Sequence, residues 1–585
     1  MIVLGLNCYH ANSAAALIID GVLTFAVEEE RLNRVKNSGG FPFLSIVECL
    51  KYNNLKLSDI DIVAINSDPK KQIFRKCTFA LKNLISLGDI KKKIKSFSRK
   101  ISLEEEFTKI KNYGNFKGKI VFVEHHLTHI ASSYYLSNFE EACGVSVDGS
   151  GDFTTTSNAL CKKNSINIQN RIFYPHSLGI FYTAISNFLG FDYYGEEYKV
   201  MAMGAYGKNT LNSKLEKLLI LENTGTFKLN LKYFIHHKNI NTFTVSENKI
   251  IISKLLEEKK VEDLLGIKKR GRGEDFKPEH FNLARSLQYL FEKAYLNYIN
   301  FSYDKYGIDN LCLAGGCAMN SLANGKILEN TKFKKLYIQP AAYDAGGAIG
   351  AALQYVANND NNIIKKNRVT KLYLGPLFKN SDIKKIINNN KYDISNKNIT
   401  VNTYSESSRE LVLMITDLLE KKKIVGIFRG RLEWGARSLG NRSILADPRG
   451  KEIKNIINQK IKRRESFRPF APIILYDDLK EWFFIEREIP SMMEVYKIKE
   501  NKKDIIPAVV HKDGTCRLQT LRKDDNHFIY NLLYEFKKKT KIPIILNTSF
   551  NENEPIVCKP EEALNTFFRT DMDALVLEDY LLLKK

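Results

Sequence analysis

VDGSGDF, at residues 147–153, is the stretch that decides the fold, because its glycines directly follow an apolar, strand-like run. Two further stretches share this design: LAGGCAMN at residues 313–320 and DAGGAIG at residues 344–350. Glycine has no Cβ atom, so backbone N–H groups in such turns can approach a phosphate, and a following helix N-terminus favours its negative charge. The turns make four glycines candidate nucleotide-binding residues: Gly149, Gly315, Gly316 and Gly346.

Three such turns in one chain predict an actin-like architecture, in which two related lobes close over a nucleotide. The chain contains neither the G-x-G-x-x-G fingerprint nor a Walker loop, so the two commonest glycine-rich alternatives are disfavoured. The competing explanation is that these glycines serve tight packing alone.

Repeated strand–turn–helix patterns predict an α/β protein. Its first strands are IVLGLN and ALIIDGVLTFAVEEE, the second with Asp20-Gly21 as a hairpin turn. The polar segment NNDNNIIKKN has no amphipathic period and marks a linker. We therefore predict an actin-like (ribonuclease H-like, two-lobed) ATPase-type domain at 1–357, a linker at 358–370, and a domain with an open twisted α/β sheet at 371–585.

The net charge of +23, with a pI of about 9.3, raises the question of an anionic partner. The lysines are dispersed, and the densest basic run, KKKIKSFSRK at 91–100, reads as an exposed helix face with one aromatic residue. This pattern is typical of a lysine-biased proteome, so a nucleic-acid partner is not expected.

Several features predict a cytoplasmic protein. No stretch approaches the roughly 20 apolar residues that a membrane span needs, so no membrane partner is expected. The start MIVLGLN lacks the basic and long apolar segments of a signal peptide. Nine cysteines without a CxxC pair favour reduced thiols.

The segment VFVEHHLTHIASSYY holds three of the chain's 10 histidines. His125 and His129 are four residues apart, so on a helix both rings lie on one face. Two imidazoles at this spacing can begin a metal site, whereas the alternative is a polar, partly exposed helix start. His126 points elsewhere and is interpreted either as a structural residue or as a residue that supports the metal ligands from behind.

Two carboxylates strengthen the metal hypothesis. Asp148 ends an apolar strand and Asp344 begins a helix, which are positions where α/β folds place ligands. Two histidines and two aspartates suit iron, manganese or zinc, and leave open positions for a substrate.

Three segments of the second domain predict an anion pocket. GRLEWGARSLGNRSILADPRG (430–450) and KRRESFRPFAP (462–472) supply arginines, and LNTSFNENEPI (546–556) supplies amides and hydroxyls. Guanidinium groups bind phosphate bidentately, although any single arginine could be only a surface charge.

Along nearly its whole length, the chain resembles the O-carbamoyltransferases that include nodulation-factor, cephamycin and aminoglycoside (tobramycin) carbamoyltransferases. The resemblance is specific because a long series of motifs occurs in the family's order. The matching stretches are HANSAAALIIDG, EEERLNRVKNSGGFP, EHHLTHIASSYY, VDGSGD, PHSLGIFYTAISNFLGF, EEYKVMAMGAYG, LAGGCAMNSLANGKI, PAAYDAGGAIGAAL, RLEWGARSLGNRSILADPR, FRPFAP and LNTSFN.

This resemblance implies a two-step enzyme. Its N-terminal domain would be like the actin-like tRNA threonylcarbamoyl-transferase subunit, and its C-terminal domain like the synthase of threonylcarbamoyl-adenylate. The C-terminal domain would convert carbamoyl phosphate and ATP with Mg into carbamoyl-adenylate, phosphate and pyrophosphate. The N-terminal domain would then transfer the carbamoyl group to a hydroxyl-bearing acceptor, leaving AMP. A homo-oligomer is compatible with the sequence.

The resemblance also carries residue roles onto matching positions. The family's metal ligands fall on His125, His129, Asp148 and Asp344, with iron as the first expectation and manganese or zinc as alternatives. Asp148 is also expected to be catalytic, and His10 is a candidate general base. The adenylate-binding segment matches Gly315, Gly316 and Asn320. The activation domain's positions match Arg431, Arg437, Arg442, Arg468, Asn547 and Ser549. Lys36, ahead of Gly40-Phe41-Pro42, is expected to meet an anionic group.

The chain departs from the family pattern at a few positions, which puts substrate detail in doubt but not the reaction class. Ala11 stands where many members have Asp, Tyr343 replaces a usual Gly beside Asp344, Ala436 and Ser438 replace Pro and Ala, and Asn553 replaces Gly. Three other readings stay open: an actin-like sugar kinase or ATPase, a tRNA-modifying threonylcarbamoyl-type transferase, and a non-catalytic scaffold.

Overall fold

The computed structural model describes residues 1–83, 103–238, 243–246, 249–359, 367, 372–405 and 409–585. The chain divides into two compact units, Met1–Thr370 and Lys371–Lys585. The basic run at 91–100 and most of the expected linker at 358–370 lie outside the described residues.

The first sheet of unit 1 has the strand order β3-β2-β1-β4-β5. Three antiparallel strands come first: β1 (Ile2–Asn7), β2 (Ala14–Ile19) and β3 (Val22–Glu28). The parallel strands β4 (Ile62–Ile65) and β5 (Lys119–Phe122) complete the sheet. The predicted hairpin at Asp20-Gly21 is confirmed, and both residues have the positive φ (50° and 84°) that a two-residue hairpin turn requires.

The second sheet repeats this design, with the order β14-β13-β6-β7-β8. Its antiparallel part is β6 (Glu141–Gly151), β7 (Thr154–Lys162) and β8 (Ser165–Phe173). Its parallel part is β13 (Asn310–Ala314) and β14 (Lys335–Ile338). Two sheets with one shared topology in a single unit confirm the predicted two-lobed, actin-like arrangement.

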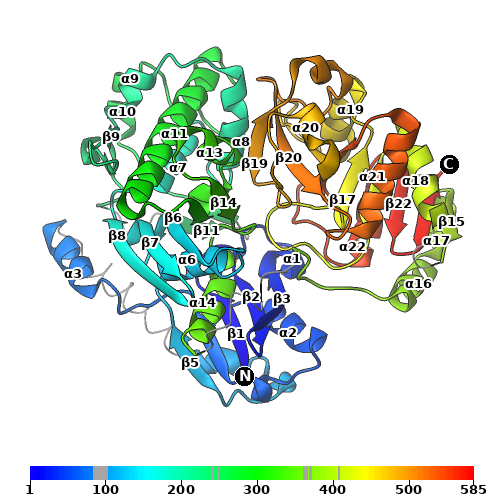
Figure 1. The fold of residues 1–585 in the computed structure, drawn as a ribbon, viewed down its shortest axis with the longest axis horizontal. Helices are drawn as coiled ribbons and strands as arrows, with labels where there is room; N and C mark the ends of the chain where they lie inside the picture. The colour runs from blue at the N-terminus through cyan, green and yellow to red at the C-terminus, as the bar shows by residue number, and fades with distance from the viewer. Residues whose placement is uncertain (84–102, 239–242, 247–248, 360–366, 368–371, 406–408) are drawn as a thin grey trace. The chain divides into compact units, whose positions relative to one another are not determined.

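Two helices join the lobes of unit 1. α6 (His125–Tyr134) contacts β6 and β13, and α14 (Gly346–Ala357) contacts β1, β2 and β4 as well as α6 (Figure 1). α14 can lie this close because its side chains are small: a Cβ atom on Gly350 would stand 1.8 Å from the Thr128 carbonyl oxygen. The outer faces carry α2 (Phe43–Tyr52) on the first sheet, and α7 (Leu178–Phe188) and α11 (Pro278–Tyr306) on the second.

Shorter elements complete unit 1. They are α1 (Glu29–Asn33), α3 (Ile73–Lys82), α5 (Glu104–Thr108), α8 (Glu197–Met203), α9 (Asn212–Leu215), β9 (Leu219–Leu221), β10 (Phe227–Leu229), β11 (Phe243–Ser246), β12 (Lys249–Ile252), α10 (Glu258–Leu265), α12 (Ser321–Asn324) and α13 (Ile327–Asn330).

Unit 2 is built on one mixed sheet of nine strands, ordered β15-β23-β22-β16-β17-β21-β18-β20-β19. A continuous core of isoleucine, leucine, valine and phenylalanine packs around it, as an open α/β sheet requires. The strands are β15 (Ile399–Thr403), β16 (Val425–Phe428), β17 (Arg442–Ala446), β18 (Ala471–Leu475), β19 (Glu494–Lys497), β20 (Thr515–Leu521), β21 (Ile544–Ser549), β22 (Ala574–Leu577) and β23 (Tyr580–Lys584). The helices are α16 (Asn380–Asn389), α17 (Lys391–Asn396), α18 (Arg409–Glu420), α19 (Lys451–Ile456), α20 (Leu479–Trp482), α21 (His527–Thr540) and α22 (Pro560–Arg569).

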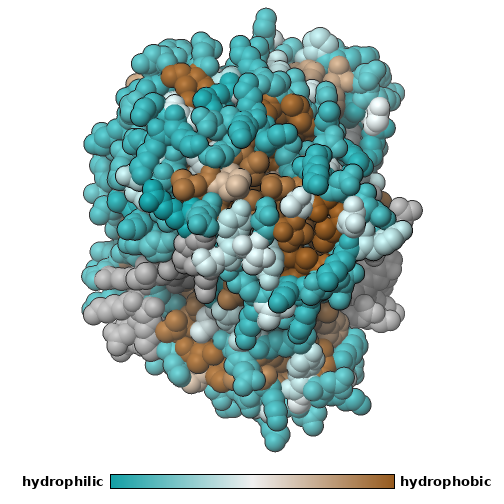
Figure 2. Space-filling model, turned by 90° about the vertical axis from the view of Figure 1, so that its right-hand side faces the viewer, coloured by the Kyte–Doolittle hydropathy of each residue, from teal (hydrophilic) through white to brown (hydrophobic). Residues whose placement is uncertain are grey.

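None of the helices in the described part of the chain has both the length and the apolar character to cross a membrane. On the face that Figure 2 draws, hydrophilic residues predominate and hydrophobic residues form separate patches. All nine cysteines are without disulfide bonds, and Cys77 alone among them is exposed.

Candidate functional site

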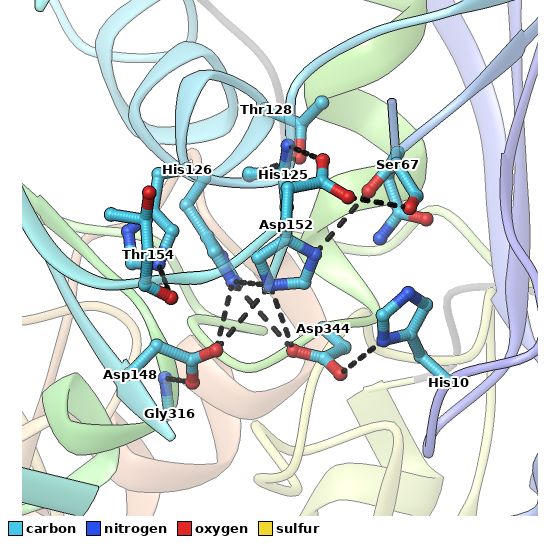
Figure 3. Close-up of polar contacts among 12 residues, drawn as sticks. His10, Ser67, His125, His126, Thr128, Asp148, Asp152, Thr154, Gly316 and Asp344 are labelled. Carbon is cyan, nitrogen blue, oxygen red and sulfur yellow. Dashed lines mark hydrogen bonds and ion pairs between the residues drawn. The ribbon is translucent and has the colours of Figure 1, made fainter. Parts of the chain in front are cut away.

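Unit 1 brings the four predicted metal ligands together from three places in the fold (Figure 3). His125 and His129 are the first and fifth residues of α6, Asp148 lies in β6, and Asp344 lies in the turn between β14 and α14. The two Nε2 atoms are 3.0 Å apart. Nε2 of His125 lies 3.3 Å from Asp148 Oδ2 and 3.5 Å from Asp344 Oδ1. Nε2 of His129 lies 3.8 and 3.6 Å from the same two oxygens.

These distances fit a single metal ion. One ligand atom from each of the four residues lies within 4.8 Å of all the others. Ligands held at about 2.1 Å from one ion are separated from each other by roughly 3–4 Å. The two Nε2 atoms have this spacing from each other and from both carboxylate oxygens. Two imidazoles and two carboxylates are a donor set that first-row divalent metals accept.

Backbone groups orient two of these ligands. The Nδ1–H of His125 donates to the Asn66 carbonyl oxygen at 3.3 Å, which leaves the Nε2 lone pair directed at the cluster. Asp148 Oδ1 accepts the backbone N–H of Gly316 at 2.8 Å, so Oδ2 is the oxygen that faces the histidines. A Cβ atom at Gly316 would lie 2.9 Å from Asp148 Oδ1, which explains a glycine there.

The charges in the cluster favour a bound cation. His125 and His129 are buried, and Asp148 is 7% exposed. Burial alone favours neutral forms, yet hydrogen bonds and charges from Asp148 and Asp344 outweigh it and raise the pKa of His129 to about 9. Burial likewise opposes ionisation of Asp148, and the two histidines outweigh it and lower the pKa of that carboxyl well below its usual range. A metal cation would supply the positive charge that the carboxylates attract here.

The remaining histidines of the region differ in their surroundings. His10 Nδ1 lies 3.8 Å from Asp344 Oδ2, the His10 ring centroid lies 5.2 Å from that of His125, and the His10 side chain is 18% exposed. His126 is buried with Nε2 at 3.0 Å from the Thr154 carbonyl oxygen and Nδ1 at 3.4 Å from Ser157 Oγ. Burial lowers the pKa of His126 well below its ordinary value, so it stays neutral in a structural role.

The predicted glycines serve different purposes. Gly315 has a φ of +90°, and a Cβ atom there would meet the Val147 carbonyl oxygen at 2.2 Å; one at Gly346 would meet the Ala341 carbonyl oxygen at 2.3 Å. Both therefore satisfy close packing. Gly149 has nothing within 4 Å of the Cβ position, so its backbone borders open space next to Asp148.

Two further predicted residues lie apart from the four ligands. The Asn320 side chain caps α12 by accepting the Ala323 N–H at 3.1 Å, and its amide pairs with that of Gln288 at 3.0 Å in both directions. Lys36 is exposed on the loop that follows α1.

Unit 2 gathers arginines around Arg517, a half-buried residue of β20. Burial lowers the pKa of Arg517 well below the usual arginine range, and the like charges of Arg437, Arg464 and Arg468 lower it further. A multiply charged anion would complement four guanidinium groups whose like charges destabilise one another in this way. The sequence indicated Arg437 and Arg468, whereas Arg517 was missed because its strand, TCRLQTL, carries no motif.

The β21 strand end adds polar groups in unit 2. Lys462 is 1% exposed, and its Nζ lies 3.2 Å from Ser549 Oγ and 2.8 Å from Asn551 Oδ1. Asn547 is 1% exposed, and its Nδ2 donates to the Ser438 carbonyl oxygen at 2.9 Å and to Gln519 Oε1 at 3.0 Å. Within the described residues, Asn547 Oδ1 has no hydrogen-bond partner.

The other two predicted arginines contact the protein itself. Arg431 Nε donates to the Gly375 carbonyl oxygen at 3.1 Å. Arg442 is fully buried, its guanidinium lies 3.6 Å from the centre of the Phe428 ring, and its Nη1 donates to two backbone carbonyl groups. The loop between them is organised by Glu433, which the sequence did not single out and whose Oε1 accepts three backbone N–H groups.

Comparison with known proteins decides the family. The family model described as "Carbamoyltransferase N-terminus" matches residues 2–353, and the one described as "Carbamoyltransferase C-terminus" matches residues 416–584. The chain belongs to the carbamoyltransferase family. The resemblance read from its motifs is thus confirmed, and the protein is a transferase.

Relatives of this carbamoyltransferase match it over nearly its full length. Nodulation protein NolNO of Sinorhizobium fredii is 34% identical over 99% of the chain and 80% of its own length. Protein sll1178 of Synechocystis is 35% identical over 100% of the chain and 96% of its own length. Protein MJ1051 of Methanocaldococcus jannaschii is 32% identical over 99% of both.

Solved structures are similar only at a distance. Component A of the (R)-2-hydroxyglutaryl-CoA dehydratase of Acidaminococcus fermentans is 15% identical with a TM-score of 0.33, and covers 61% of this carbamoyltransferase and 100% of that chain. HypF of T. kodakarensis is 12% identical with a TM-score of 0.29, and covers 62% and 48%.

Proposed function

We propose that the protein is an ATP-dependent O-carbamoyltransferase that works in two steps. Unit 2 makes carbamoyl-adenylate from carbamoyl phosphate and ATP, and unit 1 transfers the carbamoyl group to a hydroxyl of a small-molecule or sugar acceptor. The observation that carries this proposal is the presence, within one carbamoyltransferase chain, of a two-histidine, two-aspartate cluster in unit 1 and a four-arginine cluster in unit 2.

The first step brings several anions together. Water cleaves carbamoyl phosphate to carbamate and phosphate; a carbamate oxygen then attacks the α-phosphorus of ATP, which forms carbamoyl-adenylate and expels pyrophosphate. Arg437, Arg464, Arg468 and Arg517 supply positive charge where negative charge accumulates, without needing to reorganise during the reaction.

The second step needs a polarised carbonyl and a base. His125, His129, Asp148 and Asp344 would hold a divalent metal, which would supply Lewis-acid polarisation of the carbamoyl carbonyl and positive charge for the AMP phosphate. His10 takes the proton of the acceptor hydroxyl as it attacks the carbonyl carbon. Asp344 Oδ2, at 3.8 Å from His10 Nδ1, stabilises the imidazolium that results. The leaving group is AMP.

The first experiment requires no acceptor. Purified protein is incubated with Mg, ATP and carbamoyl phosphate, and nucleotides and pyrophosphate are quantified. We expect AMP and pyrophosphate in equal amounts and only with carbamoyl phosphate. Arg517→Gln should slow their formation by about 100-fold. Arg522→Gln is the matched control, because Arg522 follows the same strand but is 47% exposed and pairs with Glu488.

Two outcomes would contradict the proposal. ADP formed without dependence on carbamoyl phosphate would indicate a sugar kinase or ATPase. If Arg517→Gln and Arg522→Gln slowed AMP and pyrophosphate formation equally, the arginine cluster would have no specific role in the activation step. Asp344→Ala is expected to keep AMP and pyrophosphate formation, because Asp344 belongs to the transfer site.

A further inference from the structure

Asp152 occupies a central position beside the metal-ligand cluster without being part of it (Figure 3). Its Oδ2 accepts the backbone N–H of His125 at 2.9 Å and that of Asp68 at 2.8 Å. Its Oδ1 accepts the hydroxyl of Ser67 at 2.9 Å. One carboxylate in the β6–β7 turn thus connects the second sheet of unit 1 to the end of β4 in the first sheet and to the start of α6.

α6 depends on this carboxylate for its N-terminal cap. The first N–H groups of a helix have no partner within the helix and need an external acceptor. The residue at the N-cap position, Glu124, makes no side-chain capping bond. Asp152 supplies the acceptor from a distant segment, and its negative charge also favours the helix N-terminus.

Three residues at the end of β6 and in the turn after it contact His125. Asp148 Oδ2 lies 3.3 Å from Nε2 of His125. A Cβ atom on Gly151 would stand 2.0 Å from the imidazole ring, so the backbone of this turn is packed against the ring itself. Asp152 holds the main-chain nitrogen. Residues 148–152 therefore contact the Nε2 atom, the ring and the main-chain nitrogen of His125, in addition to the Asn66 carbonyl oxygen that accepts its Nδ1–H.

The backbone of the turn is strained to make this possible. Asp152 has a φ of +47° and Phe153 a φ of +71°, a region that non-glycine residues rarely adopt. The Phe153 ring packs against Phe79 and Tyr174, with centroids 5.4 and 5.8 Å away. Such strain persists only where surrounding contacts overdetermine it, and it is concentrated at functional sites.

We propose that Asp152 is the positioning residue for His125, and that it sets the affinity of the cluster for a divalent metal without touching the ion. This inference rests on the metal centre proposed above. Without the carboxylate, the first turn of α6 loses its cap, and the Nε2 atom of His125 is no longer held at metal-binding distance from Asp148 and Asp344. Groups that orient ligands in this way typically contribute 10- to 100-fold in metal affinity.

The test measures Co²⁺ binding to the full-length protein. The dissociation constant is determined by competition with a chelator, and the ligand-field absorption of bound Co²⁺ reports coordination geometry. Asp152→Ala should weaken binding by about 10- to 100-fold and change the spectrum. Asp152→Asn should stay within about threefold of wild type, because its oxygen can accept both N–H groups while its amide faces the Ser67 hydroxyl.

The control is Asn54→Ala, which places alanine at another positive φ (+52°) on an exposed turn of unit 1. It should lower thermal stability without altering the Co²⁺ affinity. If Asp152→Ala bound Co²⁺ as tightly as the wild type, with the same spectrum, Asp152 would serve stability alone and the inference would be overturned. Failure of the wild type to bind Co²⁺ would instead overturn the proposed metal centre, and this inference with it.

Discussion

At the scale of single residues, Glu28 shows how the site is tied to the protein behind it. It is 2% exposed, accepts the phenol of Tyr343 at 2.8 Å, and lies 3.3 Å from Arg31. Tyr343 directly precedes the proposed ligand Asp344, so this hydrogen bond anchors the turn that presents the carboxylate. Burial raises the pKa of Glu28 from 4.5 to about 7, more than Arg31 lowers it.

A raised carboxyl pKa has a defined effect on stability. The folded state binds the Glu28 proton more tightly than the unfolded state does, so protonation of Glu28 stabilises the fold. This stabilisation is fully present below about pH 4.5 and is lost as pH rises through about 7. Glu28→Gln cannot ionise and keeps an acceptor for Tyr343. We expect its free energy of unfolding, relative to the wild type, to rise by roughly 2–3 kcal/mol between about pH 5 and pH 8.

Urea unfolding at a series of pH values measures this difference. Glu48→Gln is the control, since the Glu48 side chain is 29% exposed and its partner is Lys51, 3.8 Å away. Its unfolding curve should follow that of the wild type across the series. A Glu28→Gln difference that did not change with pH would refute the assignment of this titration to Glu28.

Residues that depend on local spacing were predictable, and those that depend on long-range contact were not. His125 and His129 share a helix face, and Asp148 ends a strand, so their sequence context predicted that they would lie together. Asp152 and Arg517 acquire their roles from segments dozens of residues away, such as Ser67 for Asp152 and Arg437 for Arg517. Arg442 has the context of an anion-binding residue, yet its side chain turns into the core against Phe428.

At the scale of elements, the approach of α14 to α6 determines how the ligands meet. The strand–turn–helix pattern predicted both helices, but not the sheet order that brings them side by side. The two helices can lie this close because Gly350 of α14 has no side chain and packs directly on the Thr128 backbone of α6. Asp344 precedes α14 and His129 follows Thr128, so a change in this separation moves two ligands apart.

Two glycine substitutions separate packing from ligand binding. Gly350→Ala must push α14 away from α6, because its Cβ would lie 1.8 Å from a carbonyl oxygen. We expect a loss of about 1–3 kcal/mol in unfolding free energy and about tenfold weaker Co²⁺ binding. Gly149→Ala meets nothing within 4 Å. It should leave the free energy of unfolding within about 0.5 kcal/mol of the wild type. It should weaken AMP binding, because we expect the Gly149 backbone to contact the adenylate.

Denaturant unfolding and calorimetric titration with Co²⁺ and AMP measure these effects. Gly350→Ala should lower the stability and the Co²⁺ affinity, whereas Gly149→Ala should lower only the AMP affinity. If Gly149→Ala bound AMP as tightly as the wild type, the Gly149 backbone would have no role in nucleotide binding.

At the scale of the whole molecule, the two units differ in what stabilises them. Each has its own sheets and its own buried core, so we expect each to unfold as a separate cooperative unit. Unit 1 contains the proposed metal-ligand cluster, whereas unit 2 contains the arginine cluster proposed to bind anions. A ligand that binds one folded unit should stabilise that unit alone.

Scanning calorimetry of the full-length protein should therefore resolve two transitions that respond to different ligands. Pyrophosphate at about 100 times its dissociation constant stabilises by about 2.7 kcal/mol, which corresponds to roughly 5–10 °C for a domain the size of unit 2. Saturating Co²⁺ should raise the other transition, and a chelator should reverse that shift. Asp344→Ala should abolish the Co²⁺ response and keep the pyrophosphate response, and Arg468→Gln should do the reverse. A single transition that moves with both ligands would mean that the two units unfold together, and the two half-sites would then be energetically coupled through the chain.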